Sequence, residues 1–260
     1  MPQHRKYPTN AARQKAYRRR HRPLTPGTLR KHAKRAGLLA HPTGQTWTLT
    51  PSCRLLCQDI RCLTDADVPP ASVDSVITDP PYGREALPLY AALGAFAVRC
   101  LKPGGSLVLL CGQLALDHVM ATLGQHLSYK WLLAWHLPGN HSTKVWSRHV
   151  LSQWKPVLLY GKEPWTAGAY YADVFRVPPT GTRTAHHPWG QEPGGMRELV
   201  RRFATPGAVV CDPFVGGGTT GLVALEAGCH FVGLDIDPAH IETVKARLAA
   251  PVANQPRPAA

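Results

Sequence analysis

The sequence predicts an α/β fold built on a doubly wound, Rossmann-like sheet. Short apolar runs alternate with longer helical segments, first over residues 73–111 and again over residues 196–249. A glycine-rich segment also follows one of these runs directly and leads into a helix. Alternation of strands and helices is typical of parallel sheets with helices on both faces, so we expect that architecture here.

The individual elements follow from hydrophobic periodicity and from the turn residues that bound each segment. Apolar runs of four to six residues predict strands, and longer periodic segments that end near Gly or Pro predict helices. The expected strands cover residues 47–50, 54–57, 73–78, 106–111, 208–211 and 230–235. The expected helices cover residues 85–101, 196–204, 219–227 and 238–249.

Residues 131–190 depart from this alternation. The segment lacks a long periodic stretch, and it holds most of the tryptophans together with several Pro and Gly residues. We therefore expect irregular structure inserted into the sheet. Its tryptophans are expected mainly in the core, with contact to a ligand as the alternative; they include Trp131, Trp135, Trp146, Trp154 and Trp165.

The positive charge of the chain is concentrated at its N-terminal end. The formal net charge is +14, and Asp59 is the first acidic residue. We expect a basic, flexible arm over residues 1–37, a folded domain over residues 38–250 and a disordered tail over residues 251–260. A cationic arm is attracted to the phosphates of nucleic acids, and Arg18, Arg19 and Arg20 are candidates for such contacts. The alternative is a solvated tail that only aids solubility.

The composition also bears on the compartment and on metals. No run approaches the roughly 20 apolar residues of a spanning helix, and the basic N-terminus lacks the apolar core of a secretory signal, so we expect a cytoplasmic protein. The seven cysteines are odd in number and scattered, which favours reduced thiols. Cys53, Cys57 and Cys62 lack the paired spacing of a zinc site, so no metal is expected.

The glycine-rich segment is the first candidate for a binding site. It comprises residues 212–219, Asp-Pro-Phe-Val-Gly-Gly-Gly-Thr, between a predicted strand and a predicted helix. Glycines let the backbone approach a ligand closely, and Asp235 at the end of the next strand can accept hydrogen bonds from ribose hydroxyls. This pattern predicts a nucleotide-like cofactor without identifying it, and a tight turn that serves packing alone is the alternative.

The second candidate is the sequence Asp79-Pro80-Pro81-Tyr82, which follows the strand expected over residues 73–78. The prolines remove two N–H donors and restrict the backbone, so carbonyl oxygens and the Asp79 carboxylate remain as acceptors. Acceptors bind a donor such as an amino group, and the Tyr82 ring can stack on a planar base. A surface turn with an incidental acid is the alternative.

Together these motifs resemble the permuted, or beta, class of S-adenosylmethionine-dependent DNA amino-methyltransferases. The resemblance covers about residues 46–250. The shared features, in the order of that class, are Gln58-Asp59, Asp79 to Tyr82, Lys102 to Gly105, a variable region, His187-Pro188 with Gln191, and Asp212 to Thr220. The resemblance implies a circularly permuted methyltransferase sheet, S-adenosylmethionine as cofactor, double-stranded DNA as partner, and a target-recognition region within residues 131–190.

The resemblance also implies roles for single residues. Asp79 and the Pro80 carbonyl would hold the amino group of a flipped base, with Pro81 shaping the loop and Tyr82 stacking on the base. Asp235 would bind the ribose of the cofactor, and Asp59 would face its adenine. The other residues that would line the cofactor are Asp212, Phe214, Gly216, Gly218 and Thr219.

The first residue of the catalytic motif bears on the identity of the target base. Within the family, Asp in that position is more often associated with N6 of adenine, and Ser with N4 of cytosine, so we expect adenine. Cytosine N4 remains an alternative, as do an RNA substrate and an inactive DNA-binding protein of the same fold. Lys144, Arg148 and Arg183 are further candidates for contacts to nucleic acid.

Overall fold

A mixed sheet of nine strands forms the centre of the protein. The structure, a computed structural model, describes residues 44–82, 86–137, 143–177 and 193–249. The strand order in the sheet is β1-β2-β11-β10-β3-β4-β8-β5-β9. These strands are β1 (Gln45–Thr50), β2 (Cys53–Cys57), β3 (Val73–Thr78), β4 (Leu101–Leu110), β5 (Ser128–His136), β8 (Trp154–Gly161), β9 (Val174–Arg176), β10 (Val209–Asp212) and β11 (His230–Asp235). A separate two-stranded hairpin joins β6 (Thr143–Val145) to β7 (Val150–Ser152).

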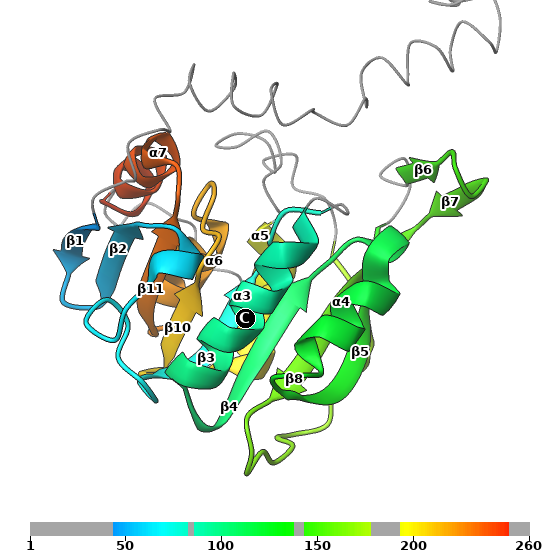
Figure 1. The fold of residues 1–260 in the computed structure, drawn as a ribbon, viewed down its shortest axis with the longest axis horizontal. Coiled ribbons are helices and arrows are strands. Elements are labelled where there is room, and N and C mark those ends of the chain that lie inside the picture. Colours follow the sequence, from blue (N-terminus) through cyan, green and yellow to red (C-terminus); the bar gives the residue numbers. More distant parts are fainter. Residues whose placement is uncertain (1–43, 83–85, 138–142, 178–192, 250–260) are drawn as a thin grey trace, which may run out of the picture. The chain divides into compact units, whose positions relative to one another are not determined.

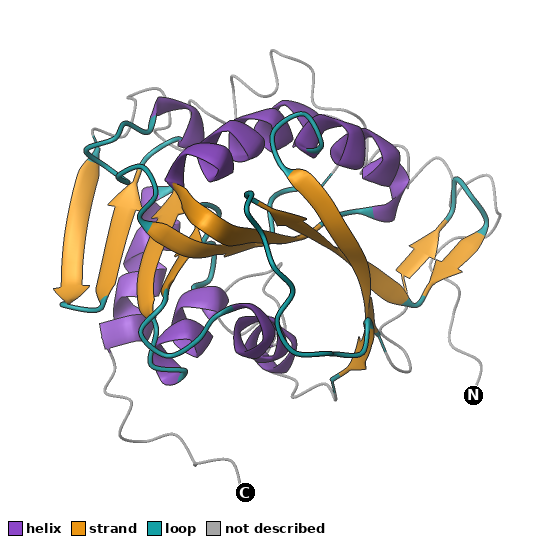
Figure 2. Cartoon of the chain, turned by 90° about the horizontal axis from the view of Figure 1, so that it is seen from below, coloured by secondary structure: helices purple, strands orange, loops and turns teal. Residues whose placement is uncertain are grey.

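Helices cover both faces of this sheet, as Figures 1 and 2 show. One core cluster joins the sheet to two helices through side chains such as Leu93, Phe96 and Leu123. The second cluster lies on the opposite face and includes Leu199, Val223 and Ile241. The first pair is α3 (Leu87–Cys100) and α4 (Leu116–Leu123), and the second group is α5 (Pro193–Phe203), α6 (Thr219–Glu226) and α7 (Pro238–Ala249). The predicted α/β class with helices on both faces is confirmed.

Five neighbouring strands of the sheet run parallel. β2 pairs with β11, β11 with β10, β10 with β3, and β3 with β4, each in parallel register. Parallel strands end at the same edge of a sheet, and ligands of open α/β sheets bind outside that edge. The loops that follow β2, β3, β4, β10 and β11 therefore open side by side.

The expectation of irregular structure over residues 131–190 was wrong for two long strands. β8 pairs antiparallel with β4, and β5 pairs antiparallel with β8, so both belong to the main sheet. The run Val157–Tyr160 is completely buried. Its residues neither alternate between apolar and polar nor repeat with the period of a helix, because a central strand is apolar on both faces. These antiparallel strands make the sheet mixed rather than purely parallel.

The tryptophans of this segment divide between core and surface. Trp135 is 2% exposed and stacks on Phe175, as the core expectation predicted. Trp131 and Trp146 are 52% and 58% exposed, so the core expectation was wrong for them. Sequence periodicity could not separate the two groups, because Trp131 and Trp135 belong to the same strand, β5, and differ only in their tertiary surroundings.

The other predicted elements match the structure closely. β3, β11 and α7 have the expected bounds, and most others differ by one to three residues. β4 is longer than expected because Leu101 already pairs with Val73, ahead of the irregularity at Lys102 to Gly105. None of the helices in the described ranges is long and apolar enough to cross a membrane.

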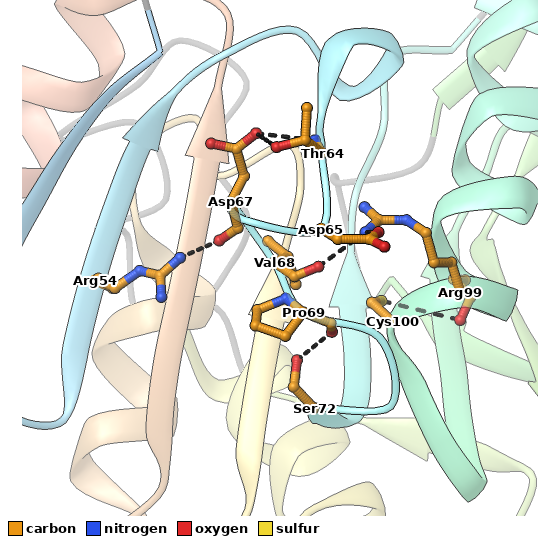
Figure 3. Close-up of polar contacts among 10 residues, drawn as sticks. Arg54, Thr64, Asp65, Asp67, Val68, Pro69, Ser72, Arg99 and Cys100 are labelled. Atoms are coloured by element: carbon orange, nitrogen blue, oxygen red, sulfur yellow. Dashed lines mark hydrogen bonds and ion pairs between the residues drawn. The ribbon is translucent and has the colours of Figure 1, made fainter.

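Two arginines fasten the connection between the 3-10 helix η1 (Ile60–Cys62) and β3 (Figure 3). Arg54 donates to the Asp67 carbonyl, and Arg99 donates to the Val68 carbonyl at 2.9 Å and pairs with Asp65. Arg54 comes from β2 and Arg99 from α3, so the connection is tied to the sheet and to a helix above it. This attachment fixes the entry into β3, the strand that leads into the Asp79 loop.

Candidate active site

The two predicted site loops lie beside each other at one edge of the sheet. The Asp79 loop, residues 79–82, follows β3, and the glycine loop, residues 212–219, follows β10. The two strands are neighbours, with Val210 opposite Ser75 and Cys211 opposite Val76. The structure thus brings together two motifs that are more than 130 residues apart in the sequence.

The backbone of the Asp79 loop is held by aromatic side chains. The Tyr82 hydroxyl donates a short hydrogen bond to Asp79 Oδ1. The buried Tyr90 donates to the Pro81 carbonyl at 3.3 Å, which fixes the middle of the loop from helix α3. The Tyr82 side chain lies directly against Gly112, where even a Cβ atom would come within 3.4 Å. These contacts give the loop a defined shape before any ligand binds.

The Tyr82 side chain is partly exposed, and its hydroxyl is bonded within the loop. The residue is 39% exposed, and the hydroxyl donates to Asp79. Desolvation, followed by the nearby Asp79 charge, raises the pKa of Tyr82 well above its ordinary range. The hydroxyl is therefore a hydrogen-bond donor at neutral pH, and the accessible ring is a surface on which a planar group can stack.

The glycine loop has the backbone geometry of a ligand cradle. Gly216 and Gly218 have φ values of 47° and 77°, a region that side chains other than glycine rarely adopt. Val215 N donates to the Leu234 carbonyl at 2.8 Å, so the loop is anchored to β11. A side chain at Gly218 would also press on Val244 of α7, at 3.1 Å. Both glycines are thus required by the local fold.

Asp235 lies at the end of β11, beside the glycine loop. Its carboxylate accepts from Gly216 N at 3.0 Å and from Asp237 N at 2.9 Å. His240 Nδ1 lies 3.1 Å from the same carboxylate, and this hydrogen bond raises the pKa of His240. The carboxylate is a fixed acceptor beside the glycine loop, where the sequence predicted a ribose-binding acid.

Asp212 is more buried than a cofactor contact would suggest. The residue is 3% exposed, and its Oδ1 accepts from Thr78 Oγ1 at 2.6 Å and from Phe214 N at 3.1 Å. Burial raises the pKa of Asp212 to about 6, although these hydrogen bonds oppose the increase. Asp212 thus links the last residue of β3 to the start of the glycine loop.

Arg247 is a site residue that sequence reasoning missed. From α7, its Nη1 donates to the Gly217 carbonyl at 2.6 Å and to Thr219 Oγ1 at 3.1 Å. Burial lowers the pKa of this guanidinium. An arginine near the end of a predicted helix carries no local signal for such a contact, which exists only because α7 folds back over the loop.

Asp59 is near the site but is engaged by its own neighbours. Its side chain caps η1 by accepting from Arg61 N at 2.9 Å, and it also forms an ion pair with the Arg61 side chain. Gln58 N donates to the Asp235 carbonyl at 3.0 Å, so the turn after β2 is fixed to the end of β11. This places Asp59 at the same edge as the glycine loop.

The candidate nucleic-acid contacts are only partly described. Lys144 and Arg148 lie in the β6–β7 hairpin, and both are exposed. Arg18, Arg19, Arg20 and Arg183 lie outside the described residues, as do residues 1–37 and the His187-Pro188 motif, so these assignments stay predictions. Among the described residues, no group of three or more His, Cys, Asp or Glu side chains could hold a metal ion.

Comparison with known proteins agrees with this geometry. Residues 166–246 match the N6/N4 DNA methylase family model. The chain is 24% identical over 239 residues to the type II methyltransferase M.HpaI of Haemophilus parainfluenzae. The match covers 75% of this chain and 74% of that protein. The family match contains the glycine loop and Asp235, whereas the Asp79 loop precedes it.

Solved methyltransferase structures share the fold. The cytosine-N4-specific PvuII DNA methyltransferase superposes with a TM-score of 0.67 at 17% identity, covering 80% of this chain and 89% of that chain. The M1.HpyAVI–SAM complex gives a TM-score of 0.57 at 22% identity, covering 68% of this chain and 89% of that chain. At these identities the likeness concerns the fold.

Proposed function

We propose that this chain, a homologue of the N6/N4 DNA methylases, transfers a methyl group from S-adenosylmethionine to the exocyclic amino group of a DNA base. The observation that carries the proposal is the parallel pairing of β3 with β10. Because of it, an acceptor loop suited to an amino group opens next to a glycine loop suited to a nucleoside cofactor. The substrate is double-stranded DNA.

The residues of the glycine loop and of β11 fit S-adenosylmethionine. The ribose of this cofactor carries two hydroxyl donors, and the Asp235 carboxylate is an acceptor with 12% of its side chain exposed beside Gly216. The glycines let the backbone lie close to the ligand, with Phe214, Gly218 and Thr219 completing the lining. Asp59 faces the cofactor adenine, and Asp212 positions the loop from beneath. When bound, S-adenosylmethionine supplies an electrophilic methyl group.

The Asp79 loop orients the base. The Asp79 carboxylate and the Pro80 carbonyl accept hydrogen bonds from the two amino hydrogens, which turns the nitrogen lone pair toward the cofactor side of the edge. Tyr82 stacks on the face of the flipped base, while Pro81 keeps the loop extended. The Tyr82 hydroxyl already donates to Asp79 Oδ1, and the carboxylate has further acceptor sites for the amino group.

Adenine N6 is the proposed target atom. The support is the acidic first residue of the motif, Asp79, which in the resembling family accompanies adenine more often than cytosine. Both amino groups present the same two donors to the loop, so the carboxylate alone does not select between the bases.

Expression in a host without DNA methylation tests the proposal. Nucleoside mass spectrometry of the host DNA should detect N6-methyladenine with the wild-type chain and none with Asp79→Ala. Asp65→Ala is a matched control, because this acid lies in the connection before β3 and contacts Arg99 rather than the site. Detection of N4-methylcytosine instead would show that the target base is cytosine, and the proposed methyl transfer to an amino group would stand. Absence of both methylated bases, together with no binding of S-adenosylmethionine by calorimetry, would refute the proposed enzymatic activity.

A further inference from the structure

The carboxylate of Asp235, the proposed ribose-binding group, is contacted on both of its oxygens. Gly216 N of the glycine loop donates to Oδ2 at 3.0 Å. On the other oxygen, Asp237 N donates to Oδ1 at 2.9 Å, and His240 Nδ1 lies 3.1 Å from the same atom. Groups at the start of α7 therefore engage Oδ1, and Oδ2 is the oxygen that faces the glycine loop.

The first turn of α7 fixes the position of His240. The Asp237 side chain accepts from Ala239 N at 2.8 Å, and the Asp237 carbonyl accepts from His240 N at 3.1 Å. The His240 side chain is 33% exposed, and the side chain of Asp235 is 12% exposed. The imidazole thus extends from the capped start of a helix to a carboxylate that is largely shielded from water. A group that positions another needs a rigid support of this kind.

The stability of α7 does not explain an ionisable ring at this position. His240 is the third residue of the helix, where the helix dipole disfavours a cation. The hydrogen bond to Asp235 nevertheless raises the pKa of His240. The second acid that faces the ring is Asp237, whose Oδ2 lies 4.0 Å from Nε2. Burial, followed by the charges of the same two acids, raises the pKa of Cys57 on the adjacent strand β2. The ring is therefore placed to interact with the carboxylate rather than to favour the helix.

We infer that His240 is a positioning residue for the cofactor, which holds Oδ1 of Asp235 and thereby keeps Oδ2 turned toward the ribose hydroxyls. The inference rests on the proposed function, which assigns the ribose to Asp235. A carboxylate that can rotate must be ordered when a ligand binds, and a carboxylate that is already held avoids that loss of entropy. The contribution of His240 should therefore be seen with ligands whose ribose carries hydroxyl groups, and it should disappear with ligands that lack them.

Calorimetry with two ligands tests this inference without relying on methyl transfer. The ligands are S-adenosylhomocysteine, the product that remains after methyl transfer, and its 2′,3′-dideoxyribose analogue, which lacks both hydroxyl groups. His240→Leu should weaken binding of S-adenosylhomocysteine by roughly 5- to 30-fold, the effect of losing one contact to a charged group. Binding of the dideoxy analogue should change by less than about twofold. His240→Asn places an amide N–H near the position of Nδ1 and should restore most of the affinity.

The ratio of the two affinities separates positioning from a general effect on folding. A variant that is partly unfolded binds both ligands more weakly by the same factor, so the ratio stays that of the wild type. His230→Leu is the matched control, because His230 is exposed at the first position of β11, at the other end of the strand from Asp235. This control should bind both ligands like the wild type.

Two results would overturn the inference while leaving the proposed function in place. One is an equal loss of affinity for both ligands in His240→Leu, and the other is a change below about twofold for S-adenosylhomocysteine. A wild-type chain that binds neither ligand would instead refute the proposed function, and the inference would fail with it.

Discussion

Thr78 Oγ1 donates a 2.6 Å hydrogen bond to Asp212 Oδ1, and both residues are buried. Thr78 immediately precedes the Asp79 loop, and Asp212 begins the glycine loop. One buried hydrogen bond therefore joins the residues from which the acceptor loop and the cofactor loop extend. This bond adds to the parallel pairing of β3 with β10 in holding the two loops beside each other.

Replacement of Thr78 by Val should destabilise the protein by about 1–3 kcal/mol, because it leaves a buried carboxylate with one donor fewer at nearly constant volume. Urea unfolding measures this change. Thr78→Ser keeps the donor and should cost less. Thr48→Val, at an exposed position of β1, should leave the free energy of unfolding nearly unchanged. Equal effects at positions 48 and 78 would show that the buried bond does not stabilise the site.

The titration of Asp212 predicts a pH dependence of stability. Burial raises the pKa of Asp212 to about 6 from its ordinary value of 3.8, so the folded chain holds this proton more tightly than the unfolded chain. The stabilisation is fully present below about pH 4 and is lost as pH rises through about 6. Between pH 4 and 7.5, the wild type should lose up to about 3 kcal/mol relative to Asp212→Asn.

Urea unfolding of both proteins across this pH range measures the difference. Thr48→Val, at an exposed position of β1 that carries no titratable group, is the control, and its curve should run nearly parallel to that of the wild type. A wild-type protein that gains stability relative to Asp212→Asn as pH rises would contradict the sign of this prediction.

Substitutions of Tyr82 can separate the effect of its hydroxyl from the effect of its ring. Tyr82→Phe removes the donor to Asp79 and keeps the ring, so methyl transfer should stay within about tenfold of the wild type. Tyr82→Ala also removes the stacking surface and should lower kcat/KM for DNA by roughly 5- to 100-fold. Transfer of a labelled methyl group to unmethylated DNA provides the measurement. Tyr129→Ala, at a 45% exposed position of β5, should have no effect. Equal losses for Phe and Ala would assign the role to the hydroxyl.

The ends of an element could be predicted where turn or capping residues mark them in the sequence. β3 ends at Asp-Pro-Pro, and α7 begins with Pro238 after a strand, so both elements could be bounded correctly. The bounds of β8 could not be predicted, because Pro156 interrupts its start and its buried run does not alternate between apolar and polar residues. Its status as a central strand is decided by pairing with β4, about 50 residues earlier in the chain, and no local pattern contains that information.

The same reasoning applies within the site. The Asp79 loop and the glycine loop were both visible as motifs, since each places unusual residues at consecutive positions. Tyr90 and Arg247 were not visible, because each acts through a contact created by a helix that returns to the edge of the sheet. Motif residues could thus be found from the sequence, whereas the residues that hold the motifs in place required the tertiary structure.

Arg247 should control the affinity for the cofactor. Arg247→Met removes the hydrogen bonds to Gly217 and Thr219 while keeping most of the apolar stem, so the glycine loop loses its support from α7. Calorimetry should show roughly 5- to 30-fold weaker binding of S-adenosylmethionine, the effect of about 1–2 kcal/mol. Lys245→Met, on the same helix but paired with Glu242, should bind the cofactor normally. Similar losses in both variants would point to a general effect of α7.

The N-terminal arm should set the salt dependence of DNA binding. Residues 1–37 contain twelve Lys and Arg and no acid, whereas residues 59–260 are nearly neutral. Each phosphate contact contributes about 0.9 to the slope of log affinity against log salt, so deletion of residues 1–37 should flatten the slope and weaken binding at low salt. Affinity for S-adenosylmethionine should not change, because the proposed cofactor residues all follow position 58.

Filter binding at several salt concentrations measures the slope, with a chain in which the arm arginines and lysines are replaced by glutamine as the matched control. That control keeps the length of the arm and should behave like the deletion. If the glutamine variant retained the wild-type slope, charge could not be the reason for the effect of the deletion. Combination with Lys144→Gln, Arg148→Gln should flatten the slope further, because an arm and a hairpin that contact different phosphates release different counterions.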